Sequence, residues 1–386
     1  MAKKKKTKFK DNSTKRVRIK IIGIGGGGGN IVKELSKKLN FSKTRVEFIV
    51  VNTDKQALNT LPENLKKVSF GEAETKGLGT GRDVLLGKKI AEAEVEKVKT
   101  IFLDDKDLYI VIASLGGGTG TGFAPVFSKV AKELNATTIG IFTLPFNFEG
   151  KGKRKEGDKA LKEAESSLNA SIVIPNEKIF KLVELNTPFN EALDVVNNHL
   201  AESLQGLLNT IYSSGLINID WADIKTTIKG TNKKAYLNTM QAKLTDDLNA
   251  FTKKLLNSDL VVYDFKESSN VLFNIEGGKK ISMQELTIIS EKIHDLAENA
   301  KIIFGLTQKP KLKDEIIATV LATGGIKPKE KKKPKENIED LNVDVNRRSG
   351  IEIKKIKEEK LKKEMEEEDY FEIPTFIRNR KKNEKS

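Results

Sequence analysis

Two glycine-rich segments are the parts of this 386-residue sequence best suited to chemistry on a phosphorylated ligand. The first, IIGIGGGGGN, spans residues 21–30, and the second, SLGGGTGTG, spans residues 114–122. Glycine costs conformational entropy on folding, but without a Cβ atom its amide can come close to a phosphate oxygen. Neither segment contains lysine or arginine. A polyphosphate would therefore be held by main-chain N–H groups and a helix dipole.

The two segments differ in how specific a signal they give. The first fits G-x-G-x-x-G at Gly23, Gly25 and Gly28, which alone favours a dinucleotide-dependent oxidoreductase or only a tight strand–helix turn. The second lacks the G-K-[ST] of the usual P-loop. As a pair they can wrap one polyphosphate, with Asn30 offering its amide to a base or ribose. A third glycine-rich loop, TKGLGTGRD (75–83), is expected to close over the phosphates.

A pair of carboxylates is the second candidate for chemistry. NIDWAD (218–223) places Asp220 and Asp223 at i and i+3, on one face of any helix that starts there. Taken alone, this spacing favours helix capping and a dipole interaction, which contribute about 0.5–2 kcal/mol. A catalytic role is compatible with capping.

The elements that position these residues alternate along the first half of the chain. Apolar strands are predicted at 16–25, 46–54, 107–115 and 137–146, and helices at 30–39, 90–102 and 123–134. This order predicts an α/β fold with a parallel sheet covered on both faces. Ligands of such sheets bind at the carboxyl ends of the strands, where both glycine segments lie.

The second half of the chain alternates less regularly. One long helix is predicted at 189–215, followed by a polar turn region at 229–236. Further helices (244–258, 283–300), a strand (270–278) and apolar segments (301–306, 315–325) complete the pattern. We expect a nucleotide-binding domain at 17–215, including the long central helix, and a smaller α+β domain at 216–325.

The net charge of +15 does not indicate a nucleic-acid surface, because it is concentrated in tails. Residues 1–18 hold nine Lys/Arg against one Asp (+8) and residues 326–337 hold six Lys against two Glu (+4), which leaves +3 elsewhere. We predict a basic arm at 1–16, a charged linker at 326–368 and a C-terminal peptide and tail at 369–386. No apolar run approaches the ~20 residues of a membrane span, and no secretory signal is predicted. The absence of cysteine suits a reducing compartment.

Taken together, these segments resemble the tubulin/FtsZ GTPase superfamily, and within it the bacterial-type FtsZ family of cell division. The resemblance covers residues 17–325 and is carried by GIGGGGGN, NTDKQAL (52–58), TKGLGTG, GGGTGTG, LPFNFEGK (144–151), IVIPNEK (172–178), GLINIDWADIKT (215–226) and ATGG (322–325). It implies GTP or GDP as ligand, with Mg²⁺ and without a protein side chain assigned as metal ligand.

The resemblance also implies site residues. Glu149 would contact the ribose, Lys153 stands where the family has arginine, and Asn197 occupies the guanine-reading position. The implied GTP-binding residues are Gly26, Gly27, Gly28, Gly29, Asn30, Gly116, Gly117, Gly118, Thr119, Gly120, Thr121, Gly122, Glu149, Lys153 and Asn197. The long helix leads away from the glycine loops, so one subunit could hardly bring both sets together. The family implies that the next subunit supplies Asn218, Asp220 and Asp223 to the γ-phosphate.

The implied function is a GTPase that forms a head-to-tail homopolymer at the mid-cell division ring, in the cytoplasm beneath the membrane. The C-terminal peptide would bind membrane-tethering and regulatory division proteins, so membrane contact would be indirect, and no specific nucleic acid is expected. The residues of that peptide assigned to partner binding are Ile373, Pro374, Phe376, Ile377 and Arg378. Two alternatives stay open: a nucleotide-dependent oxidoreductase, and a GTP-dependent scaffold that hydrolyses little because of Lys153 and Asn197.

Overall fold

The structure is a computed structural model that describes residues 17–39, 45–104, 106–184 and 186–324. The predicted basic arm, charged linker and C-terminal peptide, with the five partner-binding residues assigned to it, lie outside these residues. No helix in the described ranges is long and apolar enough to cross a membrane.

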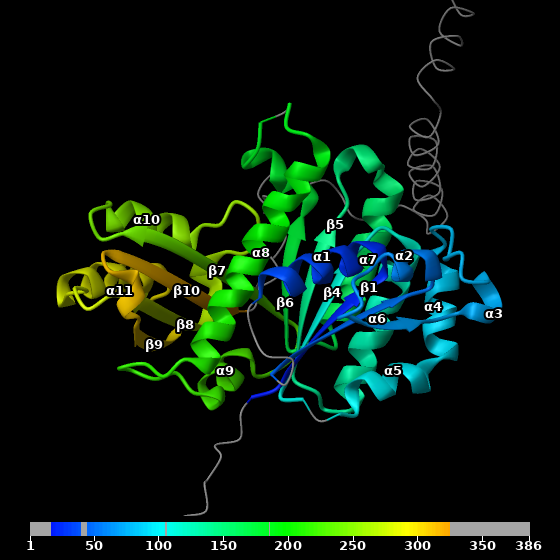
Figure 1. Ribbon diagram of the computed structural model, residues 1–386, viewed down its shortest axis with the longest axis horizontal. Coiled ribbons are helices and arrows are strands. Elements are labelled where there is room, and N and C mark those ends of the chain that lie inside the picture. Colours follow the sequence, from blue (N-terminus) through cyan, green and yellow to red (C-terminus); the bar gives the residue numbers. More distant parts are fainter. Residues whose placement is uncertain (1–16, 40–44, 105, 185, 325–386) are drawn as a thin grey trace, which may run out of the picture. The chain divides into compact units, whose positions relative to one another are not determined.

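The described residues form one ten-stranded sheet (Figure 1). Its order is β3 (Lys66–Ser69), β2 (Val46–Asn52), β1 (Ile19–Ile24), β4 (Leu108–Ser114), β5 (Thr138–Leu144), β6 (Ala170–Pro175), β7 (Lys233–Lys243), β10 (Glu315–Gly324), β8 (Ser268–Gly277) and β9 (Lys301–Gln308). The first six strands are parallel. This confirms the predicted α/β class and parallel sheet.

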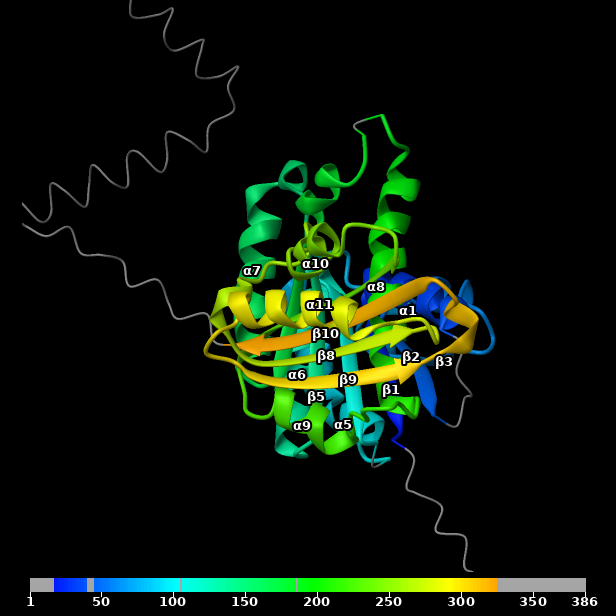
Figure 2. The same ribbon diagram turned by 90° about the vertical axis from the view of Figure 1, so that its left-hand side faces the viewer.

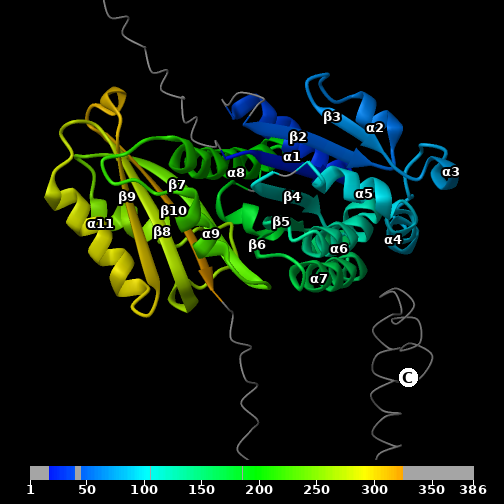
Figure 3. The same ribbon diagram turned by 90° about the horizontal axis from the view of Figure 1, so that it is seen from below.

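Helices cover both faces of the parallel strands (Figure 3). α1 (Gly25–Lys38) and α8 (Phe189–Tyr212) pack on one face, and α4 (Val84–Ala93), α5 (Val95–Phe102), α6 (Gly118–Glu133) and α7 (Lys151–Glu165) on the other. Because both faces are covered, every residue of β1 is buried, which explains its largely apolar sequence. Its one charged residue, Lys20, donates to the Ile101 carbonyl at 2.8 Å. The short elements are α2 (Lys55–Asn59), α3 (Glu72–Thr75), η1 (Asn147–Glu149), η2 (Asn176–Lys181), η3 (Phe265–Glu267) and η4 (Pro310–Leu312).

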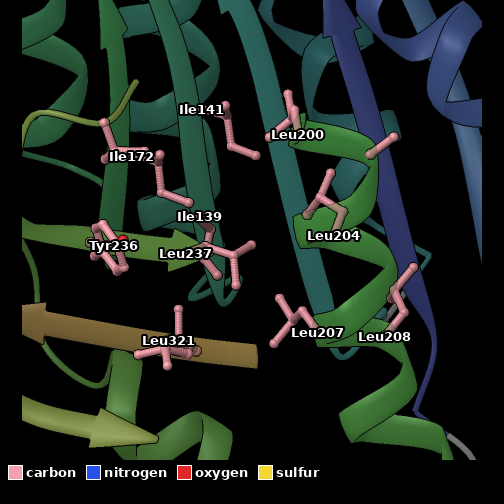
Figure 4. Packing of buried hydrophobic residues seen from close by; sticks show 14 of the residues in the cluster. Ile139, Ile141, Ile172, Leu200, Leu204, Leu207, Leu208, Tyr236, Leu237 and Leu321 are labelled. Atoms are coloured by element: carbon pink, nitrogen blue, oxygen red, sulfur yellow. The ribbon is translucent and has the colours of Figure 1, made fainter. Parts of the chain in front are cut away.

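The 24-residue helix α8 runs between the parallel strands and the C-terminal strands. Its Leu200, Leu204, Leu207 and Leu208 have helical spacing and are buried. Figure 4 shows Leu207 directed toward Leu321 of β10, with labelled residues of β5, β6 and β7 on the same side of the helix. At its end, the Tyr212 hydroxyl donates to the carbonyl oxygens of Val17 (2.9 Å) and Arg45 (3.3 Å), which precede β1 and β2. α8 therefore carries the chain to the amino-terminal edge of the sheet.

The C-terminal strands are covered by α8 and α9 (Trp221–Ile228) on one face and by α10 (Leu248–Leu256) and α11 (Met283–Leu296) on the other (Figure 2). Gly206 of α8 lies against the hydroxyl groups of Thr239 and Thr319, whereas the Asn238 amide donates to the Leu255 carbonyl of α10 at 2.8 Å. β10 is antiparallel to β7 and β8, as expected for an α+β unit. β7 joins the parallel strands through only two residue pairs of β6.

Several element boundaries differ from prediction. α1 and α6 begin at Gly25 and Gly118, inside the glycine segments, rather than at residues 30 and 123. The predicted helix at 90–102 is two helices that meet at Glu94. The predicted turn region at 229–236 contains the start of β7, where Lys233 and Lys234 pair with β6. β3, β6 and the lysine-rich α7 were not predicted from apolar spacing.

Candidate functional site

A cavity of about 430 Å³ lies at the carboxyl ends of β1, β2, β4 and β5, the predicted position for a ligand. Its wall includes the first residues of α1 and α6, the helices that follow the adjacent strands β1 and β4. Two helix N-termini thus direct main-chain N–H groups and positive dipole ends toward one space. The predicted GTP-binding residues in this wall are Gly26, Gly27, Gly116, Gly117, Gly118, Thr119, Gly120, Glu149 and Lys153.

The glycines of the two helices serve different purposes. A Cβ atom at Gly28 or Gly120 would collide with the carbonyl oxygen of Ile112 or Ser114, so these glycines let α1 and α6 pack closely on β4. A Cβ atom at Gly26 or Gly117 would meet nothing within 4 Å. Packing does not require glycine at Gly26 and Gly117, which keep the cavity open for a ligand.

The two threonines of the second loop are fixed by hydrogen bonds. The Thr121 hydroxyl accepts from the Gly116 amide at 2.7 Å and holds the loop before α6 in place. The Thr119 and Thr53 hydroxyls are 2.8 Å apart, and both side chains are buried. Thr119 lines the cavity, whereas Thr121 supports the loop from behind.

Glu149 and Lys153 form an ion pair at 2.7 Å on the β5 side of the cavity. The Glu149 carboxylate also accepts from the Phe146 amide at 2.9 Å. Burial acts to raise the pKa of Glu149, but the bonds from Lys153 and Phe146 and the charges of Lys153 and Arg82 outweigh it, so the pKa lies below its usual value. Glu149 is therefore ionised and can accept a hydrogen bond from a ribose hydroxyl.

Sequence reasoning assigned no role to several further polar residues that line the cavity. Asn52 is the last residue of β2, Asp54 follows β2, Asn176 follows β6, and Arg82 belongs to the third glycine-rich loop. The Asn52 side-chain oxygen Oδ1 accepts from the Thr53 amide at 2.9 Å. Their position just after strands was the available signal, because the carboxyl ends of parallel strands meet at one edge.

Other predicted residues do not reach this cavity. Gly28, Gly29, Thr121 and Gly122 are buried behind it. Asn30 is exposed on α1, and Asn197 is half-buried on α8 without lining the cavity. The guanine-reading role of Asn197 stays a prediction.

Asp220 and Asp223 do not line the cavity, and their hydrogen bonds confirm the capping interpretation. The Asp220 carboxylate accepts from the Asp223 amide at 2.9 Å, and the Asp223 carboxylate accepts from the Asp220 amide at 3.0 Å, which forms a capping box at the start of α9. Each carboxylate uses one oxygen in this box, and the Asp220 side chain is exposed. Both carboxylates thus keep an oxygen that can accept from a second group.

The loop before α9 is held against the C-terminal sheet. The amides of Leu216 (2.7 Å) and Ile217 (3.2 Å) donate to the Leu306 carbonyl of β9, and the Asn218 side chain accepts from the Gly215 amide at 2.5 Å. This loop follows α8, whose 24 residues span about 36 Å. The acids therefore lie near the amino-terminal edge of the sheet and the cavity at the carboxyl edge (Figure 1).

The cavity residues fit a magnesium ion that arrives with a nucleotide. Mg²⁺ sites of this kind use one or two carboxylates, water and substrate phosphates. Asp54 and Glu149 are the carboxylates in the cavity wall, but Asp54 caps α2 through the Ala57 amide (2.9 Å) and Glu149 is paired with Lys153. No group of three or more metal-ligating His, Cys, Asp or Glu side chains occurs in the described ranges. Asp54 is the side chain that would share the ion with the phosphates.

Comparison with known proteins agrees with this geometry. The profile described as "Tubulin/FtsZ family, GTPase domain" matches residues 18–184, and that described as "FtsZ family, C-terminal domain" matches residues 234–326. These matches favour a GTPase over the oxidoreductase suggested by G-x-G-x-x-G.

Solved structures of FtsZ and CetZ proteins have a similar fold. A FtsZ dimer from M. jannaschii is similar with a TM-score of 0.70 and 29% identity, over 81% of this chain and 89% of that chain. CetZ2 from Haloferax volcanii, described as a GTPγS-bound protofilament, has a TM-score of 0.69 and 21% identity, over 79% and 92%. CetZ from Methanosaeta thermophila has a TM-score of 0.67 and 21% identity, over 95% and 98%.

The motifs suggested bacterial-type FtsZ, but these similarities support only the broader family. They do not distinguish bacterial-type FtsZ from archaeal FtsZ or CetZ. The two profile matches identify residues 18–184 as a Tubulin/FtsZ-family GTPase domain and residues 234–326 as an FtsZ-family C-terminal domain, in agreement with the parallel sheet.

Proposed function

We propose that the chain is a GTP-dependent polymerising protein of the division ring, and that it hydrolyses GTP between subunits stacked head to tail. The observation that carries this proposal is the placement of two incomplete sites at opposite edges of one sheet. The cavity has amides suited to phosphates, and the N-terminus of α9 has two acids, each with an oxygen outside the capping box.

The chemistry follows from these groups. Amides at the starts of α1 and α6 hold the phosphates of GTP, and Glu149 accepts from the ribose. Asp220 and Asp223 of the next subunit, with Asn218, orient and polarise the attacking water. Bound Mg²⁺ would reduce the negative charge of the phosphates. Because the amides are already aligned, they stabilise developing charge without reorganisation.

Exposed apolar side chains at both edges support a contact between copies. At the acid edge, Leu216 is 68% and Ile217 45% exposed. At the cavity edge, Phe148 is 68% and Phe189 58% exposed, and both rings lie against Phe146. A contact of one edge with the other uses different surfaces on the two copies, so it builds an open filament unless rotation closes it. Two similar structures are described as a FtsZ dimer and a CetZ2 protofilament.

The cellular part of the proposal rests on the sequence resemblance. We place the filament at the cytoplasmic mid-cell ring, tethered to the membrane by division proteins that bind Ile373, Pro374, Phe376, Ile377 and Arg378. Capture of a purified tethering protein by the full chain, and not by a chain that ends before residue 369, is the expected result. Equal capture of both chains would contradict the role of the peptide.

Light scattering and phosphate release, followed in one sample, test the enzymatic part. With GTP and Mg²⁺ we expect scattering and a phosphate-release rate per subunit that rises with protein concentration, whereas GDP and ATP give neither. Brisk hydrolysis by a chain shown to stay monomeric would overturn the proposal.

A mixing experiment tests whether the acids act in trans. Asp223→Ala retains the cavity, and Gly117→Asp retains the acids but fills the cavity. We expect neither chain alone to hydrolyse GTP and an equal mixture to recover activity. A mixture as inactive as its components would argue against an active site shared between subunits.

One observation keeps a second candidate open, a GTP-dependent scaffold with little turnover. Lys153, which stands where the family has arginine, is paired with Glu149, and Asn197 does not reach the cavity. Filaments that scatter light with GTP but release phosphate no faster than the Asp223→Ala chain would favour the scaffold.

A further inference from the structure

The loop between α3 and α4 has an unusual backbone next to the phosphate cavity. Its residues Lys76, Gly77, Gly79, Gly81 and Arg82 all have positive φ angles. Glycine adopts this conformation freely, whereas another L-residue is disfavoured by about 1–2 kcal/mol. Arg82, with a φ of 72°, therefore occupies a position where glycine would be less strained. Strain retained beside a binding cavity suggests that the side chain has a use.

The loop is fixed on both sides of Arg82. On one side, the Lys55 amide after β2 donates to the Gly77 carbonyl at 2.9 Å. On the other, Asp83 caps α4 through the Leu86 amide at 2.9 Å. A Cβ atom at Gly118 would lie 3.0 Å from the carbonyl carbon of Arg82, so the loop packs on the first residue of α6. This packing places the Arg82 main chain beside an N-terminus that lines the cavity.

Arg82 and Lys153 are the two cationic residues in the described cavity wall. Lys153 is paired with Glu149, whereas Arg82 forms no ion pair within 4 Å among the described residues. The Arg82 charge is nevertheless one of the influences that lower the pKa of Glu149 across the cavity. An exposed guanidinium without an ion pair among the described residues, next to a cavity lined by helix N-termini, is available for an anion.

The order of the strands indicates which part of a nucleotide Arg82 would meet. Glu149 and Asn176 follow β5 and β6, at one end of the cavity wall. The loop of Arg82 is anchored after β2, on the other side of β1 and β4. A ribose held by Glu149 would direct its phosphates past the starts of α6 and α1 toward this loop. The phosphate farthest from the ribose would then lie closest to Arg82.

We infer that the Arg82 guanidinium binds the terminal phosphate of the bound nucleoside triphosphate and stabilises its charge during hydrolysis. This inference rests on the proposed GTPase function. In that reaction a water oxygen bonds to the γ-phosphorus, the bond from phosphorus to the bridging oxygen breaks, and GDP leaves with the electron pair. The water proton passes to solvent, and Arg82 stays protonated throughout.

Equilibrium binding to the dispersed protein tests the ground-state part. We expect Arg82→Ala to weaken binding of a non-hydrolysable GTP analogue by about 10- to 100-fold, the range for a charge-assisted hydrogen bond, and to leave GDP affinity within about 3-fold. Arg82→Gly should lose the same affinity without lowering thermal stability, because it relieves the positive φ angle. Arg82→Lys should fall between, since lysine keeps the charge but lacks the planar fork.

Lys76→Gly is the matched control. Lys76 is also exposed, cationic and left-handed (φ 51°) in the same loop, but it does not line the cavity. We expect its GTP and GDP affinities and its turnover to match the wild type. A loss equal to that of Arg82→Gly would show a general effect of loop charge and overturn the inference.

Two further results separate this inference from the proposed function. If the wild type binds and hydrolyses GTP while Arg82→Ala and Arg82→Gly do so equally well, the role of Arg82 is wrong and the function stands. Equal losses of GTP and GDP affinity would also overturn the assignment to the terminal phosphate. A wild type that binds neither the GTP analogue nor GDP would remove the proposed function itself.

Discussion

The two edges of the parallel sheet differ in the chemical groups that they present. At the carboxyl edge, the cavity is formed largely by main chain at the starts of α1 and α6, and glycines such as Gly28 and Gly120 are required for packing. At the amino edge, the functional groups are the carboxylates of Asp220 and Asp223 on the surface. One edge presents hydrogen-bond donors in fixed positions, and the other presents acceptors.

This difference decides how each edge responds to substitution. Some changes in the cavity wall disturb packing before they disturb binding, because an added Cβ atom at Gly25 or Gly120 meets main chain. The acid edge can lose a side chain at the cost of a helix cap, about 1 kcal/mol. Clean tests of the cavity must therefore use its open positions, and clean tests of the acids must preserve the capping box.

The largest expected effect is on turnover at the acid edge. Asp223→Asn keeps an oxygen that can accept from the Asp220 amide but removes the negative charge. We expect phosphate release to fall by about 100- to 1000-fold while GTP binding is unchanged, because the charge acts on the neighbour's water rather than on the subunit's own nucleotide.

A second capping box provides the control. Ser282 and Glu285 cap α11 with the same arrangement, on the far side of the C-terminal strands from α9. Ser282→Ala should cost about 1 kcal/mol of stability and leave turnover unchanged. Turnover in Asp223→Asn close to that of the wild type would leave the carboxylates as caps only.

The next effect is on binding at the cavity edge. Gly117 is the N-cap of α6 with extended backbone angles, and a side chain there meets nothing within 4 Å. Gly117→Asp should cap α6 slightly better than glycine and place its carboxylate where a phosphate binds. We expect thermal stability to be equal or slightly higher and GTP affinity to fall by about 100-fold or more, measured by calorimetry. Unchanged affinity would place the phosphates away from the α6 N-terminus.

The features of the two edges that could be predicted from sequence depend on local patterns of residues. Apolar strands alternating with helices indicated the parallel sheet, and the glycine segments after the strands starting at residues 16 and 107 indicated the carboxyl edge. The i, i+3 spacing of Asp220 and Asp223 indicated a cap. Each of these inferences depends on a few neighbouring residues and on the general rule that parallel strands end together.

What sequence did not reveal depends on contacts between distant residues. α1 and α6 start within glycines, poor helix formers, because their close fit to Ile112 and Ser114 stabilises them. The orientation of Asn30 away from the cavity follows from which face of α1 packs on the sheet. The left-handed backbone of Arg82 is equally invisible in a sequence, since its loop packs on Gly118, 36 residues further along the chain.

The smallest effect concerns α8, the helix that connects the two edges. The His199 ring of α8 lines a cavity of about 490 Å³ between α8 and β7, together with Glu202, Lys254 and Asp259. Its Nε2 atom is buried and has no hydrogen-bond partner among the described residues. Burial lowers the pKa of His199 below its usual 6.5.

Acid should therefore weaken the packing of this connecting helix. A lowered pKa means that the unfolded chain binds the proton more tightly, so the stability from neutral His199 is complete above about pH 6.5 and is lost as the pH falls toward the pKa of the folded state. Urea unfolding at about pH 7.5 and about pH 5.5 should show a loss on the order of 1 kcal/mol from this group. His199→Gln should remove that part of the difference, whereas His294→Gln, at an exposed position of α11, should leave it in place. An identical pH dependence in wild type and His199→Gln would mean that α8 accepts the proton without cost, and that its packing is not what ties the cavity edge to the acid edge.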